Sequence, residues 1–134
     1  MAGDKVFDRI RGQYLKATPE ELVRQSAIRW LESAGVAAAS IGREVPVSVS
    51  GRLLRADIVV YSADAVPVLV IECKAPSVTL SEKVLLQVFE YNKVLKAKYV
   101  MVTNGDDSYC FVRDNGKFVP FTEMEEMFSD IVCR

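Results

Sequence analysis

Hydrophobic and polar positions follow two different periods along this 134-residue chain. From residue 18 to about residue 34, apolar side chains recur every three or four positions, which is the period of an amphipathic helix. Thr18, Pro19 and Glu21 supply an N-cap, a proline at the first helical position and a capping-box glutamate. The pattern therefore predicts a helix here and gives Glu21 a structural explanation.

Glu20 falls on the apolar face of this helix, at its N-terminal end, with Arg24 one turn later. We expect a carboxylate at this position to point toward the protein interior and not toward solvent. A structural alternative stays open, because an acidic side chain in the first turn is favoured by the helix dipole and can pair with Arg24.

Three strand-like segments follow, at residues 44–50, 52–61 and 66–71. Ser50-Gly51 separates the first two, and a stretch rich in turn residues separates the second from the third. The third segment is almost continuously apolar, which is typical of a strand buried on both faces. The simplest arrangement is three antiparallel strands joined by hairpins.

Charged residues occupy the ends of two of these strands. Glu72 and Lys74 follow the apolar strand at a spacing of two, so their side chains point to the same face. If Tyr61 pairs with Val68 across the hairpin, Asp57 lies opposite Glu72. Opposed residues have Cβ atoms only about 5 Å apart, and like charges at that distance are destabilising unless something neutralises them.

A divalent cation would neutralise this pair of carboxylates, and Mg²⁺, which prefers oxygen ligands, is the natural candidate. Lys74 beside such an ion can orient a bound water or help to deprotonate it. These are the parts that phosphodiester hydrolysis needs. The same residues also suit a salt-bridge cluster at the rim of the sheet, and their spacing alone leaves that alternative open.

A second helix is predicted from Thr79 to about Leu95. Gln87 interrupts its apolar stripe, and Tyr91 lies one turn later on the same face. This spacing directs an amide and a phenol toward the end of the sheet that carries Glu72. An amide within an apolar stripe needs a hydrogen-bond partner, and we expect Gln87 to find one in the site.

The remaining segments predict a strand at residues 99–103 and a hairpin of residues 109–112 and 117–121. A last helix begins at Thr122, which forms a second capping box with Glu125. We therefore predict an α/β fold in one domain, residues 1–134, with a central mixed sheet flanked by helices. Residues 14–112 form its α-β-β-β-α-β core, and residues 107–134 add a C-terminal β-hairpin and helix.

Composition narrows the chemistry. The chain has no histidine, which removes Ser-His-Asp and Cys-His hydrolases and imidazole-dependent zinc sites. Neither glycine-rich nucleotide-binding motif is present, so we expect no nucleotide binding. The three cysteines lack metal-site spacing, and no segment is long and apolar enough to span a bilayer. A cytoplasmic protein without a membrane partner is expected.

Charge is divided unevenly along the chain, although its formal net value is only −1. Residues 1–98 hold 14 basic and 11 acidic side chains, a balance of +3, and residues 99–134 hold 3 and 7, a balance of −4. A mildly basic core predicts weak, salt-sensitive binding to nucleic acid without base readout. A partner subunit would then select the nucleic-acid sequence and deliver the nucleic acid to this domain.

The order of motifs resembles the PD-(D/E)xK nuclease superfamily, with Asp57, then Glu72-x-Lys74, then Gln87-x-x-x-Tyr91 on the next helix. More closely, several stretches are similar to the N-terminal nuclease domain of type I restriction enzyme R subunits. These stretches are Thr18–Gln25, Ala56–Tyr61, Val70–Pro76 and Val100–Gly105. Two departures stand out: Ala56 replaces a proline, and the helicase-like translocase of an R subunit is absent.

The resemblance implies a metal-dependent DNA endonuclease that leaves 5′-phosphates. It makes Asp57 and Glu72 ligands of Mg²⁺, with Mn²⁺ as a substitute, Lys74 the catalytic lysine, and the backbone carbonyl of Cys73 a further ligand. Glu20 would support the metal, through water, and Gln87 the active site. Residues expected to contact DNA, from this resemblance and from charge, are Arg24, Arg55, Tyr91 and Lys83.

The expected function is therefore DNA cleavage in or beside a type I restriction-modification R subunit, with a helicase, translocase or specificity subunit as partner. Two alternatives stay open. One is a catalytically silent module of the same fold, used for DNA docking or protein interaction. The other is a nuclease directed at RNA or at a particular nucleic-acid structure. The sequence contains no feature that distinguishes such a nuclease from one that cleaves DNA.

Overall fold

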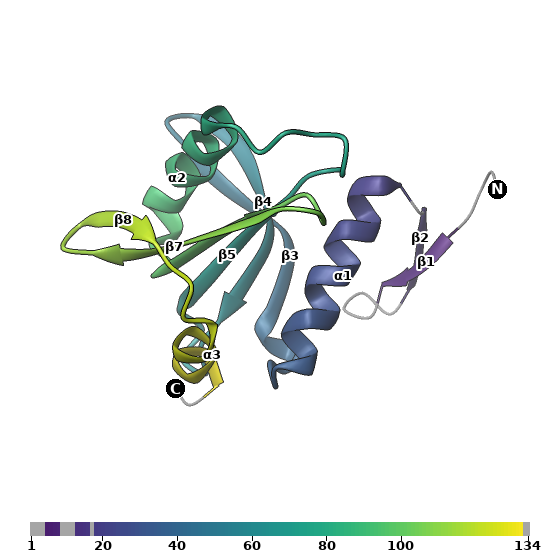
Figure 1. Ribbon diagram of the computed structural model, residues 1–134, viewed down its shortest axis with the longest axis horizontal. Coiled ribbons are helices and arrows are strands. Elements are labelled where there is room, and N and C mark those ends of the chain that lie inside the picture. The colour runs from purple at the N-terminus through teal and green to yellow at the C-terminus, as the bar shows by residue number, and fades with distance from the viewer. Residues whose placement is uncertain (1–4, 9–12, 17, 133–134) are drawn as a thin grey trace.

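A computed structural model describes residues 5–8, 13–16 and 18–132, with side chains described for 18–132. Its main layer is a six-stranded sheet, and three α-helices pack against it (Figure 1). The α-helices are α1 (Pro19–Ser33), α2 (Glu82–Leu95) and α3 (Met124–Val132), and a short 3₁₀ turn, η1, covers Ala38–Ser40. The strands are β1 (Lys5–Asp8), β2 (Gln13–Lys16), β3 (Ile41–Val49), β4 (Arg52–Tyr61), β5 (Pro67–Cys73), β6 (Tyr99–Thr103), β7 (Ser108–Asp114) and β8 (Lys117–Pro120).

The six strands of the main sheet lie in chain order, β3-β4-β5-β6-β7-β8. Neighbours pair antiparallel except β5 and β6, which are parallel and are connected through α2. The predicted α/β fold with a central mixed sheet is therefore confirmed. The two central strands β5 and β6 are buried almost throughout, as the apolar run that forms β5 predicted.

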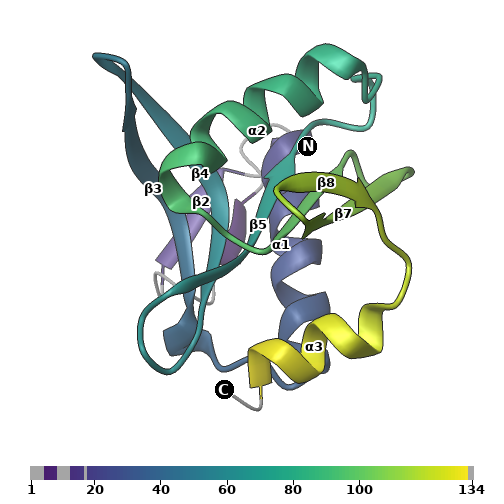
Figure 2. The same cartoon turned by 90° about the vertical axis from the view of Figure 1, so that its left-hand side faces the viewer.

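Helices cover both faces of the sheet (Figure 2). On one face, α1 and α3 contribute Ile28, Leu31 and Met127 to a core with Ile58 and Ile71. On the other face, α2 packs its apolar stripe against residues of β4, β5 and β6, among them Val59, Val70 and Val100. The period of two along β4 and β5 thus divides their side chains between two helical layers.

The hairpin between β4 and β5 has the predicted register over its central pairs. Ile58 pairs with Ile71 and Val59 with Val70, but Tyr61 pairs with Pro67 and not with Val68. The difference arises from a bulge between Val60 and Tyr61, next to a turn that is closed by the Ser62 N–H donating to the Val66 carbonyl. Because the bulge lies at the turn, the register at the charged end of the hairpin is unchanged.

Two helices begin later than their sequences predicted. α2 begins at Glu82 and not at Thr79, because the preceding loop is held in a turn and the Asn104 amide donates to the carbonyl of Val78. α3 begins at Met124, so Thr122 is not its N-cap and the second predicted capping box is wrong. The short hairpin of β1 and β2 was not predicted.

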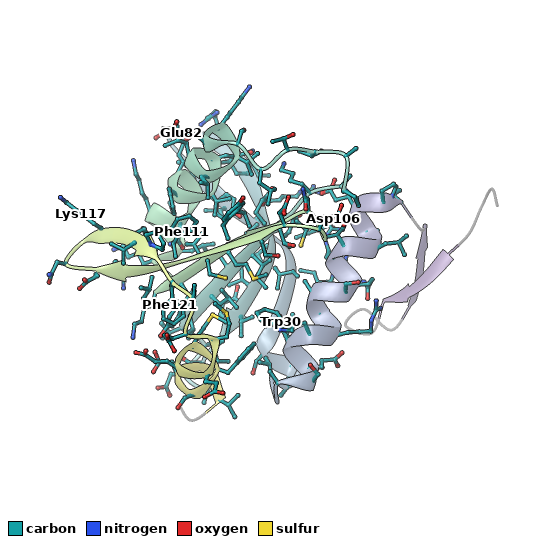
Figure 3. The ribbon with its side chains drawn as sticks, viewed as in Figure 1. Trp30, Glu82, Asp106, Phe111, Lys117 and Phe121 are labelled. Carbon is teal, nitrogen blue, oxygen red and sulfur yellow. The ribbon has the colours of Figure 1, made fainter. Side chains whose placement is uncertain are left out.

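The turn after β6 lies beside α1, whereas the β7–β8 hairpin extends away from it. In Figure 3, Asp106 lies next to α1 and Lys117 lies at the distant tip of that hairpin. A Cβ built on Gly105 would come within 3.2 Å of the Val23 side chain, so this turn approaches α1 closely. No helix in the described part of the chain is long and apolar enough to cross a membrane.

Candidate active site

Asp57 and Glu72 lie at the same end of the central sheet. The last paired residues of the β4–β5 ladder are Ile58 and Ile71, and continuing this register by one residue sets Asp57 opposite Glu72. Both carboxylates are buried, with relative exposures of 8% and 6%. Asp57 also joins the two strands directly, because its Oδ2 accepts a 2.8 Å hydrogen bond from the backbone N–H of Cys73.

Glu72 is held by two groups from different elements. Its Oε1 accepts a 2.9 Å hydrogen bond from the hydroxyl of Tyr91 on α2, and its Oε2 lies 3.3 Å from the ammonium of Lys74. Lys74 itself is fixed at its backbone, where its N–H donates to the carbonyl of Thr103 at the end of β6. The predicted proximity of Glu72, Lys74 and Tyr91 is therefore present in the structure.

Burial and the neighbouring charge of Asp57 raise the pKa of Glu72 to about 7. Lys74 and the Tyr91 hydroxyl both favour the ionised form, but they do not cancel these two effects. Burial also raises the pKa of the Tyr91 hydroxyl, so Tyr91 remains a proton donor to Glu72. The surroundings of Glu72 therefore disfavour its ionised form, and Lys74 and Tyr91 offset that effect only in part.

Arg24 reaches from α1 to Asp57. Its Nη2 donates a 3.0 Å hydrogen bond to Asp57 Oδ1, its Nη1 lies 2.6 Å from Glu21 Oε1, and Nη2 also lies 3.3 Å from Glu20. Burial opposes the charge on this guanidinium, but the adjacent carboxylates of Asp57 and Glu21 outweigh that cost and raise the pKa of Arg24. Sequence patterns had suggested only the Arg24–Glu20 pair.

The inward-pointing carboxylate of α1 belongs to Glu21 and not to Glu20. The Glu21 side chain is 9% exposed and that of Glu20 is 47% exposed, which overturns the predicted direction of Glu20. The N-cap is as predicted, because Thr18 Oγ1 accepts from the N–H of Glu21. The Glu21 carboxylate, however, accepts hydrogen bonds from Arg24, Gln25 and Arg43.

Gln87 and Tyr91 have different environments although they lie one turn apart. Tyr91 is 1% exposed, whereas Gln87 is exposed, so the expectation that its amide needs a buried partner is wrong. Water can satisfy an exposed amide. A supporting role for Gln87 at the rim of the site stays a prediction.

The four residues expected to contact DNA divide into two pairs. Arg24 and Tyr91 are buried and bonded to the two carboxylates, which argues against their direct contact with a phosphate backbone. Arg55 on β4 and Lys83 near the start of α2 are exposed. Contact of Arg55 and Lys83 with DNA stays a prediction.

The donor groups at this end of the sheet fit a hard divalent cation such as Mg²⁺. Among the described residues, each oxygen of Asp57 and Glu72 has one hydrogen-bond or ion-pair partner, and a carboxylate oxygen has capacity for about one more. The Cys73 thiol faces the α1 side and burial raises its pKa, so Cys73 would contribute only its backbone carbonyl. Within the described residues, no group of three His, Cys, Asp or Glu side chains forms a ready-made metal site.

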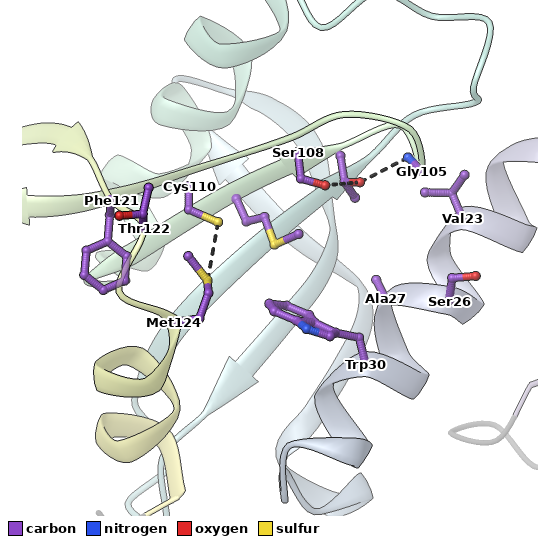
Figure 4. A pocket seen from close by; sticks show the side chains of 12 residues that line it. Val23, Ser26, Ala27, Trp30, Gly105, Ser108, Cys110, Phe121, Thr122 and Met124 are labelled. Atoms are coloured by element: carbon purple, nitrogen blue, oxygen red, sulfur yellow. Dashed lines mark hydrogen bonds between the residues drawn. The ribbon is translucent and has the colours of Figure 1, made fainter.

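A cavity of about 480 Å³ lies elsewhere, between α1, β6, β7 and the segment that leads into α3 (Figure 4). Trp30, Met101 and Met124 give it a largely apolar wall, and Thr103 and Ser108, whose hydroxyls are hydrogen-bonded to each other, also line it. Asp57, Glu72 and Lys74 do not line it. The cavity and the charged end of the sheet are therefore separate features.

Comparison with known proteins identifies one matching family model. The model is described as "Type I restriction enzyme R protein N terminus (HSDR_N)", and it matches residues 19–127. The matched segment runs from the first residue of α1 into α3 and contains every residue of the site described above. No curated protein matches the chain.

Two solved structures share the fold. A fragment assigned as an HsdR subunit of a type I restriction enzyme, from Vibrio vulnificus YJ016, aligns with a TM-score of 0.62 and 17% identity over 85% of this chain. The aligned part is 26% of that protein, so the chain spans about a quarter of its length. A protein from Anabaena variabilis ATCC 29413, assigned as a DUF820 nuclease, aligns with a TM-score of 0.51 and 12% identity over 92% of this chain and 79% of its own.

Proposed function

Because the chain belongs to the family of type I restriction enzyme R protein N-terminal domains, we propose that it is a Mg²⁺-dependent DNA endonuclease domain. It hydrolyses phosphodiester bonds as part of an R subunit or of a protein related to one. A cytoplasmic location belongs to the same proposal. The Vibrio vulnificus and Anabaena variabilis proteins support it by their fold, and the second is itself assigned as a nuclease.

One observation carries the proposal. Two buried carboxylates from adjacent strands, Asp57 and Glu72, lie at one end of the sheet, and the Lys74 ammonium lies 3.3 Å from Glu72. A sheet that needed only a stable rim would place such charges in solvent, since ionised groups are rarely buried. Their burial beside each other is the kind of strain that functional sites retain.

Each residue of the candidate site has a defined task in this proposal. Asp57, Glu72 and the carbonyl of Cys73 would hold the ion, which would supply Lewis acidity and lower the pKa of water. Tyr91 keeps Glu72 turned toward the site through its 2.9 Å hydrogen bond. Lys74 holds a positive charge where the phosphate would carry its developing negative charge, and it can assist proton transfer from the attacking water.

DNA is the proposed substrate, and the rest of a longer protein is the proposed partner. The related Vibrio vulnificus chain is about four times as long as the aligned region. Exposed Arg55 and Lys83 are too few for strong independent binding, so a translocase or specificity subunit would deliver the DNA.

Nicking of supercoiled plasmid in Mg²⁺ or Mn²⁺ tests the proposal. The native chain should cleave, and Asp57→Ala, Glu72→Ala and Lys74→Ala should each lose at least about a hundredfold in rate. Lys117→Ala, at the distant hairpin tip, is the matched control for Lys74 and should cleave normally. Equal cleavage by all five preparations would indicate contaminating nuclease and remove the proposal.

A catalytically silent module is the second candidate, and one observation favours it. Asp57 and Glu72 already have cationic partners within the chain, Arg24 and Lys74, so the site is partly neutralised without an ion. Calorimetric titration with Mn²⁺ separates the two candidates. A silent salt-bridge cluster binds no Mn²⁺ at millimolar concentration, whereas a nuclease site binds it and loses that binding in Asp57→Ala.

A further inference from the structure

We propose that Arg24 is a positioning residue of the cation site, through which α1 holds the Asp57 carboxylate in its binding orientation. This inference rests on the proposed function, because it concerns the same carboxylate. It replaces the expectation that Arg24 meets a DNA phosphate. It also gives α1 a direct part in the site, although neither Asp57 nor Glu72 lies on α1.

The Asp57 carboxylate is held at both oxygens by two different elements. Oδ1 accepts from Arg24 Nη2 on α1 at 3.0 Å, and Oδ2 accepts from the Cys73 N–H on β5 at 2.8 Å. A carboxylate bonded at both oxygens cannot rotate about its terminal torsion without breaking one of the bonds. Arg24 and β5 together therefore fix the plane in which a ligand would approach Asp57.

Arg24 is itself fixed from the other side. Its Nη1 lies 2.6 Å from Glu21 Oε1, and Glu21 also accepts from Gln25 on α1 and from Arg43 on β3. Arg24 is 7% exposed, so solvent does little to weaken these contacts. The contacts run without a gap from β3 through Glu21 and Arg24 to Asp57.

The shape of the guanidinium explains why an arginine occupies this position. Nη1 bonds Glu21 while Nη2 bonds Asp57, so the planar fork spans two carboxylates at once. A lysine ammonium is a single point of charge and cannot reach both in the same geometry. Replacement of Arg24 by lysine should therefore keep the charge and lose the orientation.

The Cys73 amide reports the orientation of Asp57 without any metal, because its proton is donated to Asp57 Oδ2. Amide hydrogen exchange and the ¹H–¹⁵N spectrum of metal-free protein should be recorded for the native chain, Arg24→Gln and Arg24→Lys. We expect the Cys73 signal to move upfield and its exchange to accelerate at least about tenfold in both variants. Arg29→Gln is the matched control, because Arg29 lies on the exposed face of α1 and bonds Ser26.

Mn²⁺ titration of the same proteins gives the second measurement. Loss of a partner that orients a metal ligand typically weakens metal affinity roughly 10- to 100-fold, and we expect a loss in this range for Arg24→Gln. Tyr99→Phe controls for lost stability, because it removes a buried hydroxyl that bonds Asp130 at the other end of the sheet. It should lower the melting temperature and leave Mn²⁺ affinity unchanged.

The outcomes separate this inference from the function on which it rests. If the native chain binds no Mn²⁺, the proposed function fails and the Cys73 amide alone decides the role of Arg24. An unchanged Cys73 amide in Arg24→Lys overturns the inference, as does native or tighter Mn²⁺ affinity in a folded Arg24 variant. If Arg24→Gln does not fold, Arg24→Lys carries both measurements, since it retains the positive charge beside Glu21.

Discussion

The hydroxyl of Tyr91 on α2 donates a 2.9 Å hydrogen bond to Oε1 of Glu72 at the end of β5. This bond ties the α2 layer to the same end of the sheet that α1 reaches through Arg24 and Asp57. The two carboxylates are therefore each held from a different face of the sheet. Substitution of Arg24 on α1 or of Tyr91 on α2 should therefore change how a carboxylate of the site is held.

Tyr91→Phe should destabilise the protein by about 1.5 to 3 kcal/mol at pH 8, because a buried carboxylate loses its hydrogen bond. The substitution keeps the ring and removes only the hydroxyl, so the core packing against α2 is retained. Urea unfolding measures the change. Tyr109→Phe, at an exposed position on β7, is the control and should be neutral. A neutral Tyr91→Phe would mean that the hydroxyl does not bond Glu72 in solution.

The raised pKa of Glu72 predicts that metal-free protein loses stability as the pH rises. The folded protein holds the proton up to about pH 7, whereas the unfolded chain releases it near its ordinary value of 4.5. The stabilising contribution is complete below pH 4.5, declines as the pH rises toward 7, and is lost above that. At about 1.4 kcal/mol per pKa unit, the decline approaches roughly 3 kcal/mol.

Glu72→Gln should remove this pH dependence, because the amide does not ionise. In EDTA, the variant should be more stable than the native chain at pH 8 and of equal stability at pH 4. Chemical unfolding at both pH values makes the comparison. A native chain whose stability does not fall between pH 5 and pH 8, relative to Glu72→Gln, would contradict the raised pKa.

Glu21 and Glu20 should differ sharply in their effect on stability. Glu21→Gln removes the negative charge from a buried carboxylate that Arg24 and Arg43 share, which typically costs about 3 kcal/mol or more. Glu20→Gln removes one partner from a half-exposed pair, which typically costs about 1 kcal/mol or less. Thermal unfolding of the two variants side by side tests the assignment. Equal losses would show that the two carboxylates share the interior position.

The sequence predicted those parts of the site that lie on regular strands and missed those that depend on contacts between layers. Asp57, Glu72 and Lys74 were found because strand period and hairpin register are local properties that place side chains on a known face. The helix bounds of α1 followed equally from its cap and its apolar spacing. These features need no knowledge of what packs against them.

The role of Glu21 could not be read from the chain because its partner Arg43 lies 22 residues away on β3. Adjacent helix positions differ by about 100°, so a small rotation of α1 decides which of Glu20 and Glu21 faces the sheet. That rotation is set by the packing of Ile28 and Leu31 against the strands. Only the assembled layers could show that the capping-box position was the buried one.

Gln87→Ala should leave stability unchanged and weaken DNA binding. The side chain is exposed, so its loss should cost less than about 0.5 kcal/mol. It lies one turn from Tyr91 on α2, which is where DNA would pass if it reached Glu72. Fluorescence anisotropy of a labelled duplex in Ca²⁺ measures the affinity. Leu86→Ala, also exposed on α2, is the control, and equal affinities in the two variants would remove Gln87 from the site.

Arg55 and Lys83 should contribute to DNA binding through charge alone. Each phosphate contact releases counterions, so the logarithm of affinity falls with the logarithm of salt by about 0.9 per contact. Arg55→Gln and Lys83→Gln should each reduce that slope by about one and weaken binding equally for different duplex sequences. Lys117→Gln removes the same charge at the tip of the β7–β8 hairpin, far from α1, and should leave the slope unchanged. Titration of a labelled duplex at several salt concentrations gives the slopes, and a loss of equal size in Lys117→Gln would show that only net charge matters.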